Sequence, residues 1–239
     1  MTRLIALFSA TLLLASCSLW PAAEEKKDGD YAQLWQNAYD RTENSDLKAT
    51  LDNNRDTLVS NGFDVTVLSE EESKQVTQVL TLIARNTQDP AMIEILMSNS
   101  AGNIQLWLAK NPALPSKYYE RFLTSDDTDQ RAYLAANPSL TEKEFGVLKN
   151  DAEASVRWVV ARNKNTPIDI LEEFVNDSSY HVTVMLARNE SITEEIMSFL
   201  VAQAHPSVMA ALRKREDLPA AISEQVEAFF AVDTEPTDE

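Results

Sequence analysis

Cysteine, glycine and histidine are all scarce in this chain. It has one cysteine, four glycines and two histidines among 239 residues. A single cysteine excludes a disulfide framework and a zinc site built from cysteines. So few glycines disfavour phosphate-binding glycine loops and sheets joined by many tight turns. The sequence therefore favours an all-α fold that is stabilised by packing alone.

Positive charge is also in short supply. The chain has 21 Lys and Arg residues against 38 Asp and Glu residues, a formal net charge of -17. Nucleic-acid binding depends on clustered cations that neutralise phosphates, so no nucleic-acid partner is expected. An anionic membrane surface would repel such a domain. Any attachment to a membrane therefore needs something other than surface charge.

The N-terminus contains a short export signal. Arg3 precedes an apolar run over residues 4–14, which is too short for a membrane-spanning helix of about 20 residues. The run ends in Leu14-Ala15-Ser16-Cys17, which resembles the bacterial lipobox. That resemblance implies removal of residues 1–16 and lipid attachment at Cys17. Ser18, where an inner-membrane retention signal has Asp, implies an outer membrane lipoprotein that faces the periplasm. An ordinary signal peptide with an incidental cysteine is the alternative.

Composition divides the remaining chain into four segments. Residues 17–30 are polar and charged, which predicts a flexible tether, and residues 233–239 form an acidic tail that we expect to be disordered. Apolar residues at helical spacing predict an N-terminal helical cap over residues 31–68, with a stop signal at Asn61-Gly62. Ser69 and Glu72 match a capping box that opens the next segment, residues 69–232.

A repeated phrase of apolar residues, alanine, a cation and asparagine dominates residues 69–232. Five copies end at asparagines that are 25 or 26 residues apart, and a sixth, degenerate copy ends at Arg215. The copies end at Asn86, Asn111, Asn137, Asn163, Asn189 and Arg215. A fixed period of this length indicates a solenoid. We therefore predict about six repeats with a period of about 26 residues.

Each repeat is predicted to be a pair of helices. Pro or Thr stands four residues after each Asn, where Pro tolerates the first turn of a helix and Thr caps it. The alanine two residues before each Asn is expected where neighbouring helices approach closely. The Asn is expected to close the second helix of its pair in the left-handed conformation, with its side chain on free backbone groups. A ligand-binding row of asparagines is the alternative.

The repeat resembles the leucine-rich repeat variant, a bacterial helical repeat similar in style to HEAT repeats. The resemblance covers about residues 76–230 and is carried by Val156-Arg157, Val160-Ala161-Arg162-Asn163 and Thr166-Pro167. It implies a right-handed α-helical solenoid in which an α-helix pairs with a second, often 3₁₀, helix. The period is longer here than is usual for that family, and the cysteines of its iron–sulfur member are missing. The resemblance implies a fold and hardly any function.

One residue before each Asn, a cation recurs. Stacking of the repeats would align these cations as a positive edge that binds a partner. The candidate edge consists of Arg85, Lys110, Arg162, Arg188 and Lys214, interrupted by Ala136 and extended by Arg131 and Arg157. The alternative is that each cation only stabilises the dipole at its helix C-terminus.

The chain has little catalytic equipment. His181 and His205 fall at different positions in the repeat, so we do not expect them to meet at a metal. Asp126-Asp127 is expected to cap a helix, and Trp107 and Trp158 are expected to stack in the core, with a sugar platform as the alternative. We therefore expect no enzyme, no cofactor and no metal.

These features predict a binding or scaffolding lipoprotein that holds a periplasmic protein or peptide on its repeat surface. A structural spacer or envelope-assembly factor is the second interpretation. An enzyme with an unrecognised carboxylate site, acting on glycans, is the third.

Overall fold

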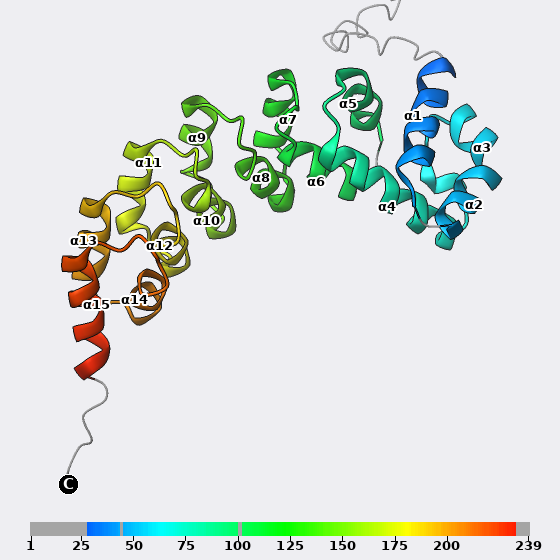
Figure 1. The fold of residues 1–239 in the computed structure, drawn as a ribbon. Coiled ribbons are helices and arrows are strands. Elements are labelled where there is room, and N and C mark those ends of the chain that lie inside the picture. Colours follow the sequence, from blue (N-terminus) through cyan, green and yellow to red (C-terminus); the bar gives the residue numbers. More distant parts are fainter. Residues whose placement is uncertain (1–27, 44, 100–101, 233–239) are drawn as a thin grey trace, which may run out of the picture.

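The computed structural model describes residues 28–43, 45–99 and 102–232. Over these residues the chain is all-helical and has no strand, as the sequence predicts. The helices pack in chain order and form the curved row seen in Figure 1. The signal, Cys17, most of the predicted tether and the acidic tail lie outside the described residues.

Three short α-helices and a 3₁₀ turn make the first part of the row. They are α1 (Asp28–Arg41), α2 (Ser45–Asn53), α3 (Arg55–Ser60) and η1 (Val65–Val67). Helix α1 thus begins three residues before the predicted start of the cap at Tyr31. Leu34 of α1 and Leu58 of α3 are both fully buried in the core. The predicted stop is confirmed, because α3 ends at Ser60 and Gly62 has a φ of 64°, which favours glycine.

Helices then alternate between two sides of the row. The inner helices, on the concave side in Figure 1, are α4 (Glu70–Asn86), α6 (Gly102–Lys110), α8 (Thr128–Ala135), α10 (Ala154–Arg162), α12 (Tyr180–Ala187) and α14 (Pro206–Leu212). The outer elements are α5 (Pro90–Met97), η2 (Ser116–Tyr118) with α7 (Tyr119–Leu123), α9 (Glu142–Leu148), α11 (Ile168–Glu173) with η3 (Phe174–Asn176), α13 (Glu194–Ala202) and α15 (Ala220–Val232). Each inner helix packs on the next.

Local sequence signals start these helices where they were expected. Ser69 and Glu72 form a complete capping box before α4, and the Asp127 side chain accepts the Asp129 amide before α8. Thr193 caps α13 by accepting the Ile196 amide. Residues 182–184 are all β-branched, which favours a strand, but they are helical within α12. Packing on their neighbours thus outweighs their strand propensity.

Small residues allow the inner helices to approach one another. The alanine two residues before each repeated asparagine is fully buried in all five copies: Ala84, Ala109, Ala135, Ala161 and Ala187. A larger side chain there would have to push two helices apart, and core overpacking costs about 1–3 kcal/mol. The predicted packing role of these alanines is confirmed.

The expected backbone conformation of the repeated asparagines is wrong. Asn163 has φ -67° and ψ 121°, which is extended, and the only described non-glycine residues with positive φ are Phe63 and Ala204. The expected bonds from the side chains to backbone groups are present. Asn86 donates to Leu82 of its own helix. The other four asparagine side chains reach the preceding helix pair.

Asn137 shows the arrangement best. Its side chain is fully buried, and its Nδ2 donates to the carbonyl oxygens of Ala109 (2.9 Å) and Asn111 (2.8 Å). Its Oδ1 accepts the amide of Ser139 at 2.8 Å. The two acceptors lie at the C-terminal end of α6, where carbonyls have no partner within their own helix. One side chain therefore closes its own loop and caps the helix of the preceding pair.

The same bonds recur along the row, and we call the set the asparagine ladder. Its Nδ2 donors and their carbonyl acceptors are Asn111 with Ala84 and Thr87, Asn137 with Ala109 and Asn111, Asn163 with Ala135 and Asn137, and Asn189 with Ala161 and Asn163. At the last position Arg215 donates to Ala187 (3.0 Å) and Asn189 (2.6 Å), so its guanidinium replaces the carboxamide.

Two arginine–aspartate pairs join neighbouring helix pairs by a second route. Arg131 Nε lies 2.7 Å from Asp151, and Arg157 Nε lies 2.8 Å from Asp177. Both pairs are bidentate, with a second bond from Nη2. The aspartate side chains are 8% and 7% exposed. Each arginine also donates to loop carbonyls before its own helix, at Ser125 or Asp151.

The environment of Asp177 lowers its pKa. Burial alone raises the pKa, but the hydrogen bond from Arg157, the Ser179 amide and the positive charge of Arg157 outweigh it. The pKa of Asp151 is lowered in the same way, against burial, by Arg131 and the Glu153 amide. A carboxylate with a lowered pKa stabilises the fold at a pH above its unfolded pKa of about 3.9. That stability is lost as the pH falls through the lower, folded pKa.

Replacing Asp177 by Asn should therefore destabilise the protein in a pH-dependent way. Near pH 7 we expect the free energy of unfolding to fall by about 2 kcal/mol, because a buried charge-assisted pair is lost. Urea unfolding at pH 7 and at pH 3 measures this, and the deficit should shrink at pH 3. Asp169→Asn, at an exposed residue of α11, is the control and should change little at either pH. An equal deficit at both pH values would contradict the ionic origin.

Candidate functional site

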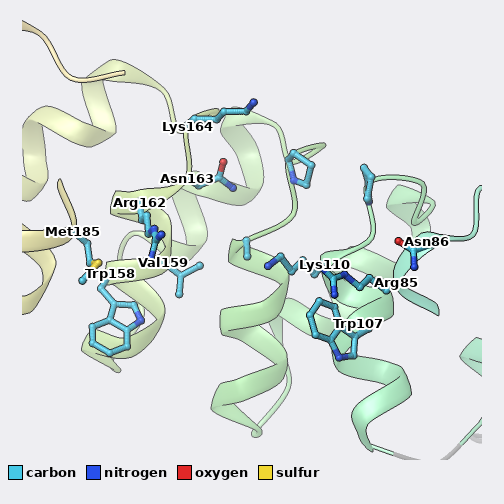
Figure 2. A pocket seen from close by; sticks show the side chains of 13 residues that line it. Arg85, Asn86, Trp107, Lys110, Trp158, Val159, Arg162, Asn163, Lys164 and Met185 are labelled. Atoms are coloured by element: carbon cyan, nitrogen blue, oxygen red, sulfur yellow. The ribbon is translucent and has the colours of Figure 1, made fainter. Parts of the chain in front are cut away.

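A groove crosses the inner side of the row. Its volume is about 860 Å³, and residues from α4, α6, α10, α12 and the loops after the inner helices line it (Figure 2). The loops contribute Pro112 and Pro138 to the lining. The groove therefore spans several helix pairs and is built by the part of each pair that the asparagine ladder holds in place.

Four cations line this groove, and no Asp or Glu does so among the described residues. The cations are Arg85, Lys110, Arg162 and Lys164. All four are exposed, and none forms a salt bridge with a described carboxylate. In a chain of net charge -17, a groove whose charged lining residues are all positive is a local reversal of charge. A positive groove of this kind raises the local concentration of anions.

Two tryptophans lie beside these cations. The Arg85 guanidinium carbon lies 4.7 Å from the Trp107 ring centroid, and Lys110 Nζ lies 5.6 Å from the same centroid. Figure 2 shows Arg85, Lys110 and Trp107 together on one side of the groove, and Trp158 with Arg162 on the other. The stacking holds the Arg85 side chain over the ring, so its guanidinium is already positioned for a ligand.

The predicted burial of both tryptophans is only partly right. Trp107 is half-buried and packs edge-on against Tyr133, with 5.5 Å between ring centroids. Trp158 is 36% exposed and lines the groove. Val159 and Met185 add further apolar surface beside it. An aromatic ring that is both exposed and flanked by cations can receive an apolar group of a ligand.

The predicted basic edge divides into two sets in the structure. Arg85, Lys110 and Arg162 stand in the last turns of α4, α6 and α10 and line the groove together. Arg188 and Lys214 are exposed and do not line it. Ala136 lies between the groove cations, as the interruption in the sequence indicated.

Arg131 and Arg157 lie elsewhere. Their side chains are 15% and 14% exposed and are occupied by Asp151 and Asp177. They join neighbouring helix pairs and do not line the groove. A sequence signal for this role existed, because both Arg–Asp pairs have the same separation of 20 residues. Lys164 was missed by the sequence analysis, since it follows the asparagine of one copy only.

The two histidines come closer together than their positions in the sequence suggested. Tyr180 lies between them, with its ring centroid 4.0 Å from His181 and 4.9 Å from His205. Trp158 meets His181 edge-on at 6.1 Å. Within the described ranges, no group of three or more His, Cys, Asp or Glu residues is arranged to hold a metal ion. The His205 side chain caps α14, because it accepts the backbone amide of Ser207.

The groove side chains are suited to binding anions. Arg and Lys side chains donate hydrogen bonds and cannot accept them. The Asn163 side chain also lines the groove, but both of its polar atoms have partners. Its Nδ2 donates to the ladder carbonyls, and its Oδ1 accepts the backbone amide of Asn165. Carboxylates, which only accept hydrogen bonds, therefore match the lining better than hydroxyl groups, which need donors and acceptors.

Among the residues that the structure describes, no helix has the length and apolar character needed to cross a membrane. Comparisons of the chain with protein-family models, with curated proteins and with solved structures found no match.

Proposed function

We propose that the row of helix pairs is a right-handed α-helical solenoid of six repeats, similar to the leucine-rich repeat variant. The 25- or 26-residue spacing of the asparagines and the recurrence of the same hydrogen bonds support it. In such a solenoid each repeat contacts only its neighbours, and the inner surface forms an extended binding site.

The protein's function, on this proposal, is to hold an acidic protein or peptide segment in the groove. The observation that carries the proposal is the charge reversal. Four cations, two tryptophans and, among the described residues, no Asp or Glu line one groove of a chain with net charge -17. Helix dipoles account for a cation at a helix C-terminus. They do not account for Lys164, which lies beyond α10, or for the absence of carboxylates from the lining.

A structural spacer is the second candidate. The asparagine ladder and the Arg–Asp pairs favour it, because hydrogen bonds across every interface make a row that resists bending. A spacer uses the length of the row and has no need of its groove cations. The two functions therefore differ in what charge reversal in the groove does.

The N-terminal sequence supports a proposal about location. Leu14-Ala15-Ser16-Cys17 resembles a lipobox, so acyl chains on Cys17 would anchor the protein to the outer membrane, facing the periplasm. Two or more acyl chains make such an anchor stable. The acidic domain is repelled by anionic headgroups, which leaves its groove accessible to periplasmic partners.

Photo-crosslinking in cells tests the binding function. A crosslinking amino acid at Ala136, within the groove, should capture a partner through an acidic segment that mass spectrometry identifies. The same amino acid at Val147, an exposed residue of α9, should not. The triple variant Arg85→Glu, Lys110→Glu and Arg162→Glu should abolish capture, because the groove then repels the acidic segment.

The matched control is Lys74→Glu, Lys143→Glu and Lys214→Glu. It makes the same change in net charge at exposed cations outside the groove and should preserve capture. Capture that survives reversal of the groove cations would reject the binding function and favour the spacer.

Replacing Cys17 by Ala should move the protein from the membrane fraction to the soluble fraction, because it removes the thiol to which the lipid would be attached. Labelled palmitate should be incorporated by the unmodified sequence and by a Ser18→Ala control, but not by Cys17→Ala. Retention of the Cys17→Ala protein in washed membranes would show that another feature anchors the chain.

A further inference from the structure

The groove cations form two separate groups. Lys110 and Arg85 flank Trp107, and we call these three residues the first anchor. Trp158 and Arg162 of α10, with Lys164 from the loop that follows, line the groove too, and we call them the second anchor. Between them, at the end of α8, the basic column has Ala136. Figure 2 shows the labelled residues of the two anchors on opposite sides of the view, with α8 between them.

The fold sets the distance between the anchors. The first anchor is centred on α6 and the second on α10, and α8 packs between these two helices. Helices in contact lie about 8–10 Å apart, so two steps separate the anchors by roughly 16–20 Å. An extended chain advances about 3.3 Å per residue, and five or six residues therefore span this distance.

The distance between the anchors favours an extended segment over a helix. An extended segment of five or six residues reaches both anchors. A helical segment would need about 12 residues between its contacts, because a helix rises about 1.5 Å per residue.

The chemistry of each anchor points to one kind of contact. Each has two cations for carboxylates and one indole ring for an apolar or aromatic side chain. Pro112, Pro138 and Ala136 between the anchors offer a small, uncharged surface with no side-chain donor or acceptor. Residues of the ligand that lie there are selected for size and not for charge.

We propose that the groove holds one extended acidic polypeptide segment through two acidic–aromatic contacts, five or six residues apart. The proposal rests on the proposed binding function and adds the conformation and spacing of the ligand. Two contacts on one chain bind more tightly than either alone only when the linker matches the distance between their sites.

Fluorescence anisotropy with labelled peptides tests the spacing. The peptides carry two Asp-Glu-Phe triplets separated by two, five or nine Gly and Ser residues, so that equivalent residues of the triplets are five, eight or twelve apart. The full-length lipoprotein is used in detergent micelles. The two-residue linker should bind at least tenfold more tightly than the other two. Arg85→Glu or Arg162→Glu should each remove this difference, and Lys214→Glu should leave it unchanged.

The other outcomes are distinct. Equal affinity for all three linkers, with loss of binding in the Arg85→Glu variant, would overturn the two-anchor proposal and leave the binding function standing. Tightest binding with the nine-residue linker would show a helical ligand. Binding of an anionic oligosaccharide, such as oligogalacturonate, but of none of the peptides would overturn the polypeptide. No binding of any probe, together with crosslinking that is indifferent to the groove cations, would overturn both.

Discussion

The buried asparagine ladder is the interaction on which the rest of this structure depends. A carboxamide has two donors and an acceptor in a fixed plane, and each ladder asparagine uses all three: two for carbonyls of the preceding pair and one for its own loop. A buried polar group that loses its partners costs about 1–3 kcal/mol, so slipping one helix pair past the next is unfavourable. Apolar packing alone would not fix the register so strictly.

The interfaces between helix pairs also determine which cations are available for a ligand. Arg131 and Arg157 are used at the interfaces, where buried aspartates neutralise them. Arg85, Lys110 and Arg162 stand one residue before the repeated asparagines of three inner helices, and they line the groove together. Arg131 and Arg157 are paired within the fold, whereas the groove cations are exposed. This division accounts for a positive groove on an acidic protein.

The period, the helix pairs, the caps and the buried alanines could all be predicted from the sequence, because each depends on residues close together in the chain. Asn137 shows where that reasoning stops. Its residue type and its place in the repeat indicated a helix end, but the carbonyl groups that its side chain binds lie 26 and 28 residues earlier. Trp158 was assigned to the core because large apolar residues usually are buried, and only the packing of α10 against its neighbours leaves it exposed.

The candidate site was predicted in outline. Three of the groove cations came from the repeated column, whereas Lys164 belongs to a single loop and has no periodic signal. Arg188 and Lys214 belong to the same column but do not line the groove, whose lining reaches α12 only at Met185. A periodic sequence predicts which residues are equivalent, but not which equivalent residues share one hollow.

The most direct measurement compares two ladder variants, Asn137→Ala and Arg215→Ala, by their affinity for an acidic two-anchor peptide under conditions where both are folded. Asn137 joins the helix pairs between the anchors, whereas Arg215 binds the carbonyls of Ala187 and Asn189, which do not line the groove. If the ladder sets the geometry of the groove, Asn137→Ala weakens binding several-fold and Arg215→Ala does not. Equal affinity of both variants and the unmodified protein would contradict the account.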